Sequence, residues 1–145
     1  MDIEISIAET HGLDGVVTLA AEGQPDVVIT DEPWHQLMHL CSAVAEFEHG
    51  MSAGIPYSSM PGGYQLSVDG DEVVLTGDYV PTVRYPRAEL ATAIIAATDV
   101  WLAHAAALPS VERDGVRESV AEAADAARAA VRPRPEPTEK TSDVP

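Results

Sequence analysis

The chain has 145 residues and a mass of 15.3 kDa, a size typical of one domain that can bury a core without disulfides or metals. Its 46% hydrophobic and 22% charged residues exclude wholesale disorder. The 24 acidic residues against 8 Lys and Arg give a formal net charge of −16, which disfavours binding to nucleic acid.

The charge is unevenly distributed along the chain. Residues 1–83 contain 14 acidic residues and no Lys or Arg, and the first cation is Arg84. In residues 132–145 three basic residues balance three acidic ones, and prolines alternate with polar residues. We therefore expect a single acidic domain over residues 1–131 and an extended, disordered tail over residues 132–145.

The N-terminal third predicts a three-stranded antiparallel meander. Residues 2–8 alternate between isoleucines and mostly polar residues, which is the period of a half-buried strand. Two short β-branched runs follow at residues 16–20 and 27–30, each preceded by turn residues.

A helix is expected after the third strand. Thr30 and Asp31 can cap it, Pro33 suits its first turn, and the pattern continues to about Gly50. Residues 51–63 are rich in Ser, Gly and Pro and predict the longest internal loop. The helix face expected to pack on the sheet consists of Leu37, Leu40, Cys41, Val44 and Phe47.

An Asp-Gly pair within residues 69–72 predicts a hairpin between residues 64–68 and 73–79, because Gly accepts the positive φ of a tight turn. A short strand over residues 82–85 ends at Pro86, which cannot donate to a β-ladder.

Two more helices complete the predicted fold. The first covers about residues 87–108 and is apolar on more than one face, so another element must cover it. Ser110 can cap the next helix, whose thin apolar stripe could supply the cover. We expect an α+β fold, an antiparallel sheet packed by two to three helices. The stripe consists of Val116, Val120, Ala123, Ala127 and Val131.

The sequence favours a protein without a membrane anchor in a reducing compartment. The apolar stretch Leu90–Leu108 carries Asp99 near its middle, where an acid costs about 2.5–3.5 kcal/mol on insertion scales, so it predicts a buried helix. The single Cys41 cannot form an internal disulfide, and the acidic N-terminus has no secretion signal. We therefore expect a cytoplasmic location.

His35 and His39 are candidate metal ligands, because they stand four residues apart on the first predicted helix and two histidines at this spacing can share an ion. Glu46 and His49 lie roughly 10 Å further along the same face, too far to share the ion. No HExxH motif is present. The favoured interpretation is a solvated polar face, with no metal or other cofactor expected.

Motifs for nucleophilic catalysis and phosphate binding are absent. There is no Gly-x-Ser-x-Gly elbow, the only lysine is Lys140 in the tail, and Cys41 falls on the predicted buried face. Arg84 and Arg87 could grip a carboxylate or phosphate, but we expect them to neutralise nearby acids such as Asp78 and Glu89.

The acidity favours a non-enzymatic module that recognises a basic protein, because charge complementarity speeds association and selects partners. Its sharpest form is an inhibitor of a nucleic-acid-handling protein, as immunity proteins and antitoxins are. The acids predicted to face the partner, chosen by charge and loop position, are Glu46, Glu48, Asp69, Asp71, Glu72 and Asp78.

Two alternatives remain open from the sequence. Acidity could serve solubility or host adaptation and mark no site. The chain could also be a small enzyme, or a ligand- or metal-binding domain, with a pocket under residues 51–63 near Trp34, Tyr57, Met60 and Tyr64. Spare apolar surface on the last two helices is compatible with a homodimer as well as with another partner.

Overall fold

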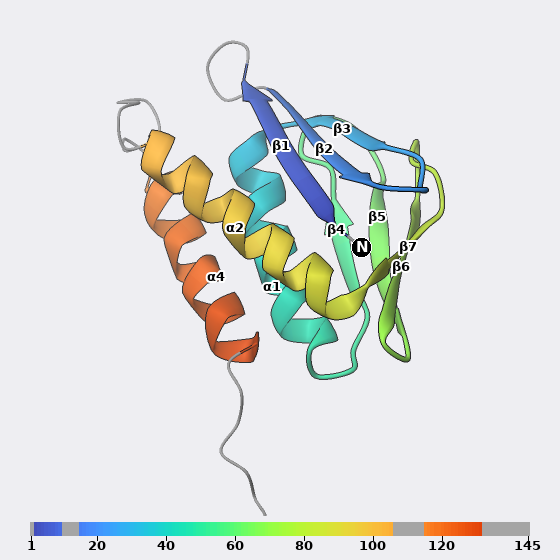
Figure 1. The fold of residues 1–145 in the computed structure, drawn as a ribbon. Helices are drawn as coiled ribbons and strands as arrows, with labels where there is room; N and C mark the ends of the chain where they lie inside the picture. The colour runs from blue at the N-terminus through green and yellow to red at the C-terminus, as the bar shows by residue number, and fades with distance from the viewer. Residues whose placement is uncertain (1, 10–14, 106–114, 132–145) are drawn as a thin grey trace, which may run out of the picture.

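The computed structural model of the protein describes residues 2–9, 15–105 and 115–131 (Figure 1). It confirms an α+β fold with antiparallel strands and three described helices. The elements in chain order are β1 (Ile3–Glu9), β2 (Gly15–Ala21), β3 (Val27–Asp31), α1 (Pro33–Phe47), β4 (Ala53–Pro56), β5 (Gly63–Asp69), β6 (Glu72–Gly77), β7 (Val83–Pro86), α2 (Arg87–Ala105) and α4 (Val116–Val131).

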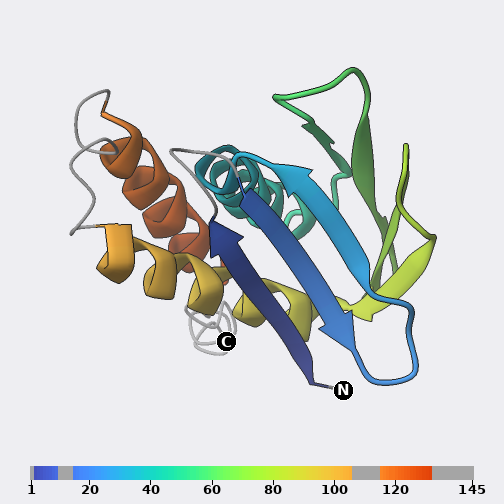
Figure 2. The same ribbon diagram turned by 90° about the horizontal axis from the view of Figure 1, so that it is seen from above.

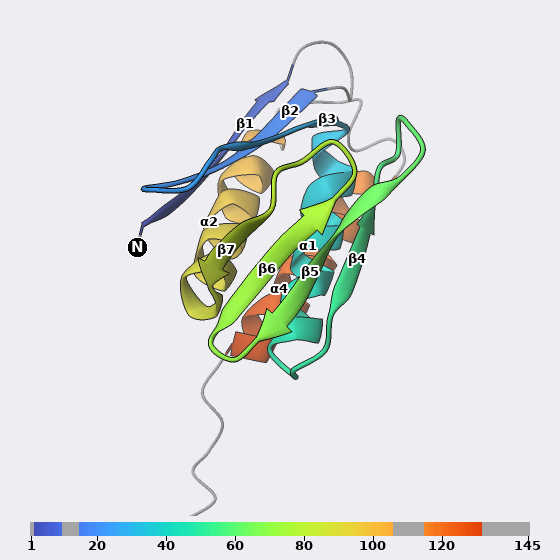
Figure 3. The same cartoon turned by 90° about the vertical axis from the view of Figure 1, so that its right-hand side faces the viewer.

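The described strands form two antiparallel sheets, whereas the sequence predicted a single sheet. The first has the order β1-β2-β3 and the second the order β4-β5-β6-β7. Helix α1 separates the two groups in the sequence and contacts both sheets and both other helices. The helices lie behind the two sheets in Figure 3, and the larger of two hydrophobic clusters contains buried residues from both sheets and all three described helices.

The predicted N-terminal meander is confirmed. All seven residues of β1 pair in regular antiparallel register with β2, from Ile3 opposite Ala21 to Glu9 opposite Gly15. The isoleucines of β1 are half-buried, while Asp2 and Glu4 are exposed. Alternation along the strand therefore separates an apolar side from an acidic side.

Helix α1 is the centre of the core, and its predicted apolar face is buried. It begins at Pro33 and ends at Phe47, three residues before the predicted end at Gly50. The predicted caps are wrong, because Glu32 occupies the N-cap position and makes no side-chain capping bond. Asp31 ends β3 instead, and its carboxylate binds a distant loop.

The prediction of an unbroken loop over residues 51–63 is also wrong, because β4 lies within it and pairs with β5. The strand was not predicted because it contains Gly54 and Pro56, and both residue types are rare inside strands. Pro56 is tolerated because β4 is an edge strand and Pro56 is its last residue.

The predicted hairpin is confirmed as β5 and β6, in which Asp69 pairs with Glu72 around Gly70. Gly70 has a φ of +64°, as expected for the tight turn. The short strand before Pro86 is confirmed as β7, which is the second edge of this sheet.

Helix α4 packs against both α1 and α2, so the predicted cover for α2 is confirmed. Its buried stripe differs from the prediction, because Ala124 is buried while Ala123 is only partly buried and Val131 is 37% exposed. The predicted cap at Ser110 and the predicted tail, residues 132–145, lie outside the described residues. None of the helices in the described ranges is long and apolar enough to cross a membrane.

Candidate functional site

Five of the six acids predicted to face a partner lie at one end of the molecule, where α1 ends and the β5–β6 turn is found (Figure 3). Asp78 is at the other end of the same hairpin, beside the Tyr64–Gly77 pair, so the structure does not bring it to this cluster. The clustered acids are Glu46, Glu48, Asp69, Asp71 and Glu72.

Both arginines predicted as anion-binding candidates pair with this acidic cluster. Arg84 Nη1 lies 2.8 Å from Asp69 Oδ2 and 3.0 Å from Glu72 Oε1. Arg87 Nε lies 3.7 Å from Glu48 Oε2. Hydrogen bonds to the two carboxylates raise the pKa of Arg84 above its ordinary value. The arginines neutralise nearby acids, as favoured above, although the partners are not Asp78 and Glu89.

The histidine pair is held by the protein itself. The rings of His35 and His39 are 4.5 Å apart, and His35 Nε2 lies 2.9 Å from the carbonyl oxygen of Pro56, to which it donates in the appropriate tautomer. Burial and the neighbouring His35 lower the pKa of His39. Among the described residues, no group of three His, Cys, Asp or Glu side chains could hold a metal ion.

A buried carboxylate that the sequence reasoning missed connects the two sheets. Asp31, at the end of β3, is only 2% exposed. It accepts hydrogen bonds of 2.7–3.1 Å from the backbone N–H and hydroxyl groups of Ser58 and Ser59, in the loop between β4 and β5. Burial raises the pKa of Asp31, but the bonds from Ser58, Gln36 and Ser59 outweigh it and lower the pKa to about 2.

Gln36 extends this network into the core. Its Nε2 donates to Asp31 at 2.7 Å, and its Oε1 accepts a 2.7 Å bond from the Tyr64 hydroxyl. The Tyr57 hydroxyl donates to the carbonyl oxygen of Asp78. These polar groups satisfy one another and hold the β4–β5 loop against α1. The only advance signal was an Asp directly after a β-branched run.

Cys41 is fully buried, as predicted, and its Sγ lies 3.3 Å from Thr98 Oγ1. Burial raises the pKa of the Cys41 thiol, so the reactive thiolate is disfavoured.

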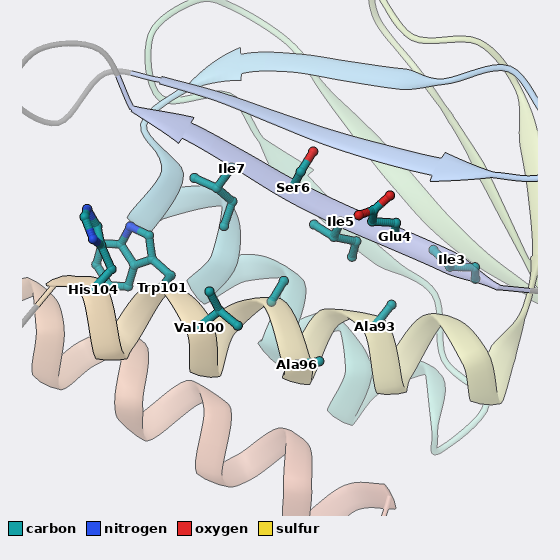
Figure 4. Close-up of a pocket in the computed structure, with 11 residues that line it drawn as sticks. Ile3, Glu4, Ile5, Ser6, Ile7, Ala93, Ala96, Val100, Trp101 and His104 are labelled. Atoms are coloured by element: carbon teal, nitrogen blue, oxygen red, sulfur yellow. The ribbon is translucent and has the colours of Figure 1, made fainter.

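An apolar groove with a volume of about 640 Å³ runs between β1 and α2. In Figure 4 the isoleucines of β1 point toward α2, whereas Glu4 and Ser6 point to the other side of the strand. Spare apolar surface on α2 was expected from the sequence, but the groove itself was not, because it forms only where α2 passes the edge of the sheet. Its walls consist of Ile3 to Ile7 from β1 and Ala93, Ala96, Ala97, Val100, Trp101 and His104 from α2.

A second hollow continues the groove toward the N-terminal end of β1 and shares Ile3, Ala93 and Ala96 with it. Asp2 and Glu89 line this end. In the described part of the chain, no hydrogen bond or ion pair joins the carboxylates of Asp2, Glu4 or Glu89 to another residue. The groove therefore has an apolar floor and an acidic end.

Comparison with known proteins adds no relative. No family model, curated protein or solved structure matches the chain.

Proposed function

We propose that this protein is a non-enzymatic interaction module that binds a basic protein. The observation that carries the proposal is a group of four exposed acids at one end of the first sheet, in β1 and beside the ends of its strands, apart from the buried Asp31. Three arginines of the described ranges, in contrast, pair with carboxylates elsewhere in the chain. The exposed acids are Asp2, Glu4, Glu22 and Asp26.

Unpaired acids on one sheet create a field that attracts a basic surface over a Debye length, which is about 8 Å at physiological salt. Such a field raises the association rate and penalises acidic competitors. The most specific form of the proposal is an inhibitor that occupies the basic groove of a nucleic-acid-handling protein, in the manner of immunity proteins and antitoxins.

The polar side chains that most suggest catalysis are used in hydrogen bonds within the fold. This favours an interaction module over an enzyme. Ser58 and Ser59 donate to the Asp31 carboxylate, whose pKa of about 2 makes it a weak base for activating a hydroxyl. His35 Nε2 is hydrogen-bonded to the carbonyl oxygen of Pro56. A hollow lined by residues 54–56, 62–65 and 76–78 lies beside the segment where a pocket was expected, and of the four side chains expected there it includes Tyr64. The Asp31 network holds the rest of that loop in place.

Affinity capture from the host lysate tests the proposal. The tagged full-length chain is compared with a D2N/E4Q/E22Q/D26N variant, with washes at low and then high salt and identification by mass spectrometry. We expect the wild type to retain a basic protein that salt releases and that the variant retains poorly. Equal retention by both baits, or no basic protein on either, contradicts the proposal.

A further inference from the structure

We propose that the basic partner adds a strand to the free edge of β1, so that a segment of alternating apolar and basic residues lies in the groove beside α2. This inference rests on the proposed function for the charge of the partner and specifies where and how the partner binds. Figure 2 shows β1 at the margin of its sheet with α2 alongside, and among the described strands β1 pairs with β2 alone.

The edge at β1 differs from the three other sheet edges. Edge strands β4 and β7 have four residues each and end in Pro56 and Pro86, and β3 has five residues. Short edges and prolines are how proteins prevent unwanted strand pairing. β1 has seven residues, no proline and no bulge in its register. Its alternate N–H and C=O groups therefore point outward along about 23 Å of strand.

Helix α2 extends beyond the sheet that it supports. Leu90 and Ile94 are buried in the core, but Val100 is 71% exposed and lines the groove with Ala93 and Ala96. This second apolar side explains why α2 is apolar on more than one face. A strand placed next to β1 would cover these residues with alternate side chains, because successive side chains point to opposite faces.

The charges on β1 specify the other side chains of the added strand. Residues on neighbouring strands that lie side by side share a face of the sheet, where opposite charges attract. An incoming strand therefore places apolar residues beside Ile3, Ile5 and Ile7, and basic residues beside Asp2 and Glu4. The predicted partner segment alternates these two types over about seven residues.

A second copy of this chain fits the groove less well than a basic partner. Pairing two β1 strands would place Asp2 and Glu4 of both copies on one face, and residues 1–83 contain no Lys or Arg to offset them. Like charges on neighbouring strands are destabilising, and each copy carries a formal net charge of −16.

The test uses a labelled seven-residue peptide that alternates Lys and Val, titrated into the full-length chain by fluorescence anisotropy. Two matched peptides are included: one has Glu in place of Lys, and the other keeps Lys and Val but is N-methylated at every peptide bond. We expect the Lys–Val peptide to bind at least tenfold more tightly than either. Equal affinity for the N-methylated peptide overturns strand addition, because that peptide cannot donate to a β-ladder.

Matched variants of α2 locate the peptide. Val100→Lys places a cation in the groove, whereas Ala103→Lys adds the same charge at an exposed position outside the groove lining. We expect affinity to fall at least tenfold in Val100→Lys and less than twofold in Ala103→Lys, with unchanged circular dichroism in both. Amide NMR shifts on peptide addition should concentrate in Ile3 to Ile7. Equal effects of the two variants, or shifts centred elsewhere, overturn the groove.

The same variants separate failure of this inference from failure of the proposed function. If the Val100→Lys chain captures the basic lysate protein as well as the wild type does, the proposed function stands and the β1 site is wrong. If light scattering shows a wild-type dimer that Val100→Lys converts to a monomer, a second copy occupies the groove and the basic segment is the wrong occupant. A wild-type monomer that loses the captured partner on Val100→Lys supports both.

Discussion

The two sheets differ in how they treat charge and free edges. In β4–β7, Arg84 binds two carboxylates at the hairpin end, and both edge strands are four residues long with a terminal proline. In β1–β3, the described acids have no arginine partner, and β1 leaves seven residues unpaired on one side. Net charge alone does not locate a binding surface, because part of it is neutralised within the fold.

The polar network around Asp31 is part of the region in which charged and polar groups are paired within the fold. It joins the end of β3 to the loop between β4 and β5, and through Gln36 it reaches Tyr64 in the core. If this network fixes the second sheet, its loss should destabilise the protein without changing the groove at β1.

The largest expected effect is that of Asp31→Ala. The substitution leaves donors of Ser58, Ser59 and Gln36 without their acceptor, and we expect the free energy of unfolding to fall by about 3 kcal/mol. Urea denaturation followed by circular dichroism measures the change. Asp26→Ala removes an exposed carboxylate near the other end of β3 and should change stability by less than about 0.5 kcal/mol. Equal losses in the two variants would show that the network is not a structural tie.

A pH dependence of about 2 kcal/mol should follow from the same carboxylate. The pKa of Asp31 is about 2 in the folded chain against 3.8 without the fold, so its stabilisation is complete above pH 4 and is lost as the pH falls through 4 toward 2. The difference in unfolding free energy between the wild type and Asp31→Asn should therefore shrink between pH 6 and pH 2. A difference that stays constant with pH would contradict the lowered pKa.

A smaller loss is expected where strands of the second sheet approach closely. A Cβ at Gly63 would lie 2.4 Å from the carbonyl oxygen of Ile55, so Gly63→Ala should lower stability by about 1–2 kcal/mol. Gly54→Ala in the neighbouring strand is the matched control, because nothing lies within 4 Å of its Cβ position. Thermal unfolding of both variants measures the difference, and a neutral Gly63→Ala would argue against the close contact.

The smallest effect is expected for Arg84→Gln. The arginine is half exposed, and exposed ion pairs add little stability, so unfolding should be unchanged within error. The substitution frees Asp69 and Glu72, which adds two unpaired carboxylates to the exposed Asp71 at the hairpin end. If the hairpin then binds the Lys–Val peptide as well as the groove does, unpaired charge is sufficient and the edge strand is unnecessary.

Local sequence signals predicted most of the secondary structure. The alternation in β1, the Asp-Gly turn of the β5–β6 hairpin and Pro33 at the start of α1 each act within a few residues, so the sequence contains the information directly. Strand β4 was missed because its Gly54 and Pro56 are untypical of strands, and only pairing with β5 defines it.

The candidate sites depended on long-range contacts and were less predictable. Charge and loop position selected Asp69 and Glu72, but their pairing with Arg84 depends on the β6–β7 register that brings these segments together. The groove depends on how far α2 extends past β1. The exposure of Val100 and the free edge of the sheet become visible only when both elements are placed.

The most direct measurement is the association rate of the Lys–Val peptide with two charge-reversal variants of equal net charge, measured by stopped flow at low salt. D2K/E4K reverses the two acids at the start of β1. E46K/D71K reverses two exposed acids, one near the C-terminal end of α1 and one in the β5–β6 turn. We expect the rate to fall at least fivefold in D2K/E4K and less than twofold in E46K/D71K. Equal decreases, or a larger decrease in E46K/D71K, would contradict binding at the first sheet.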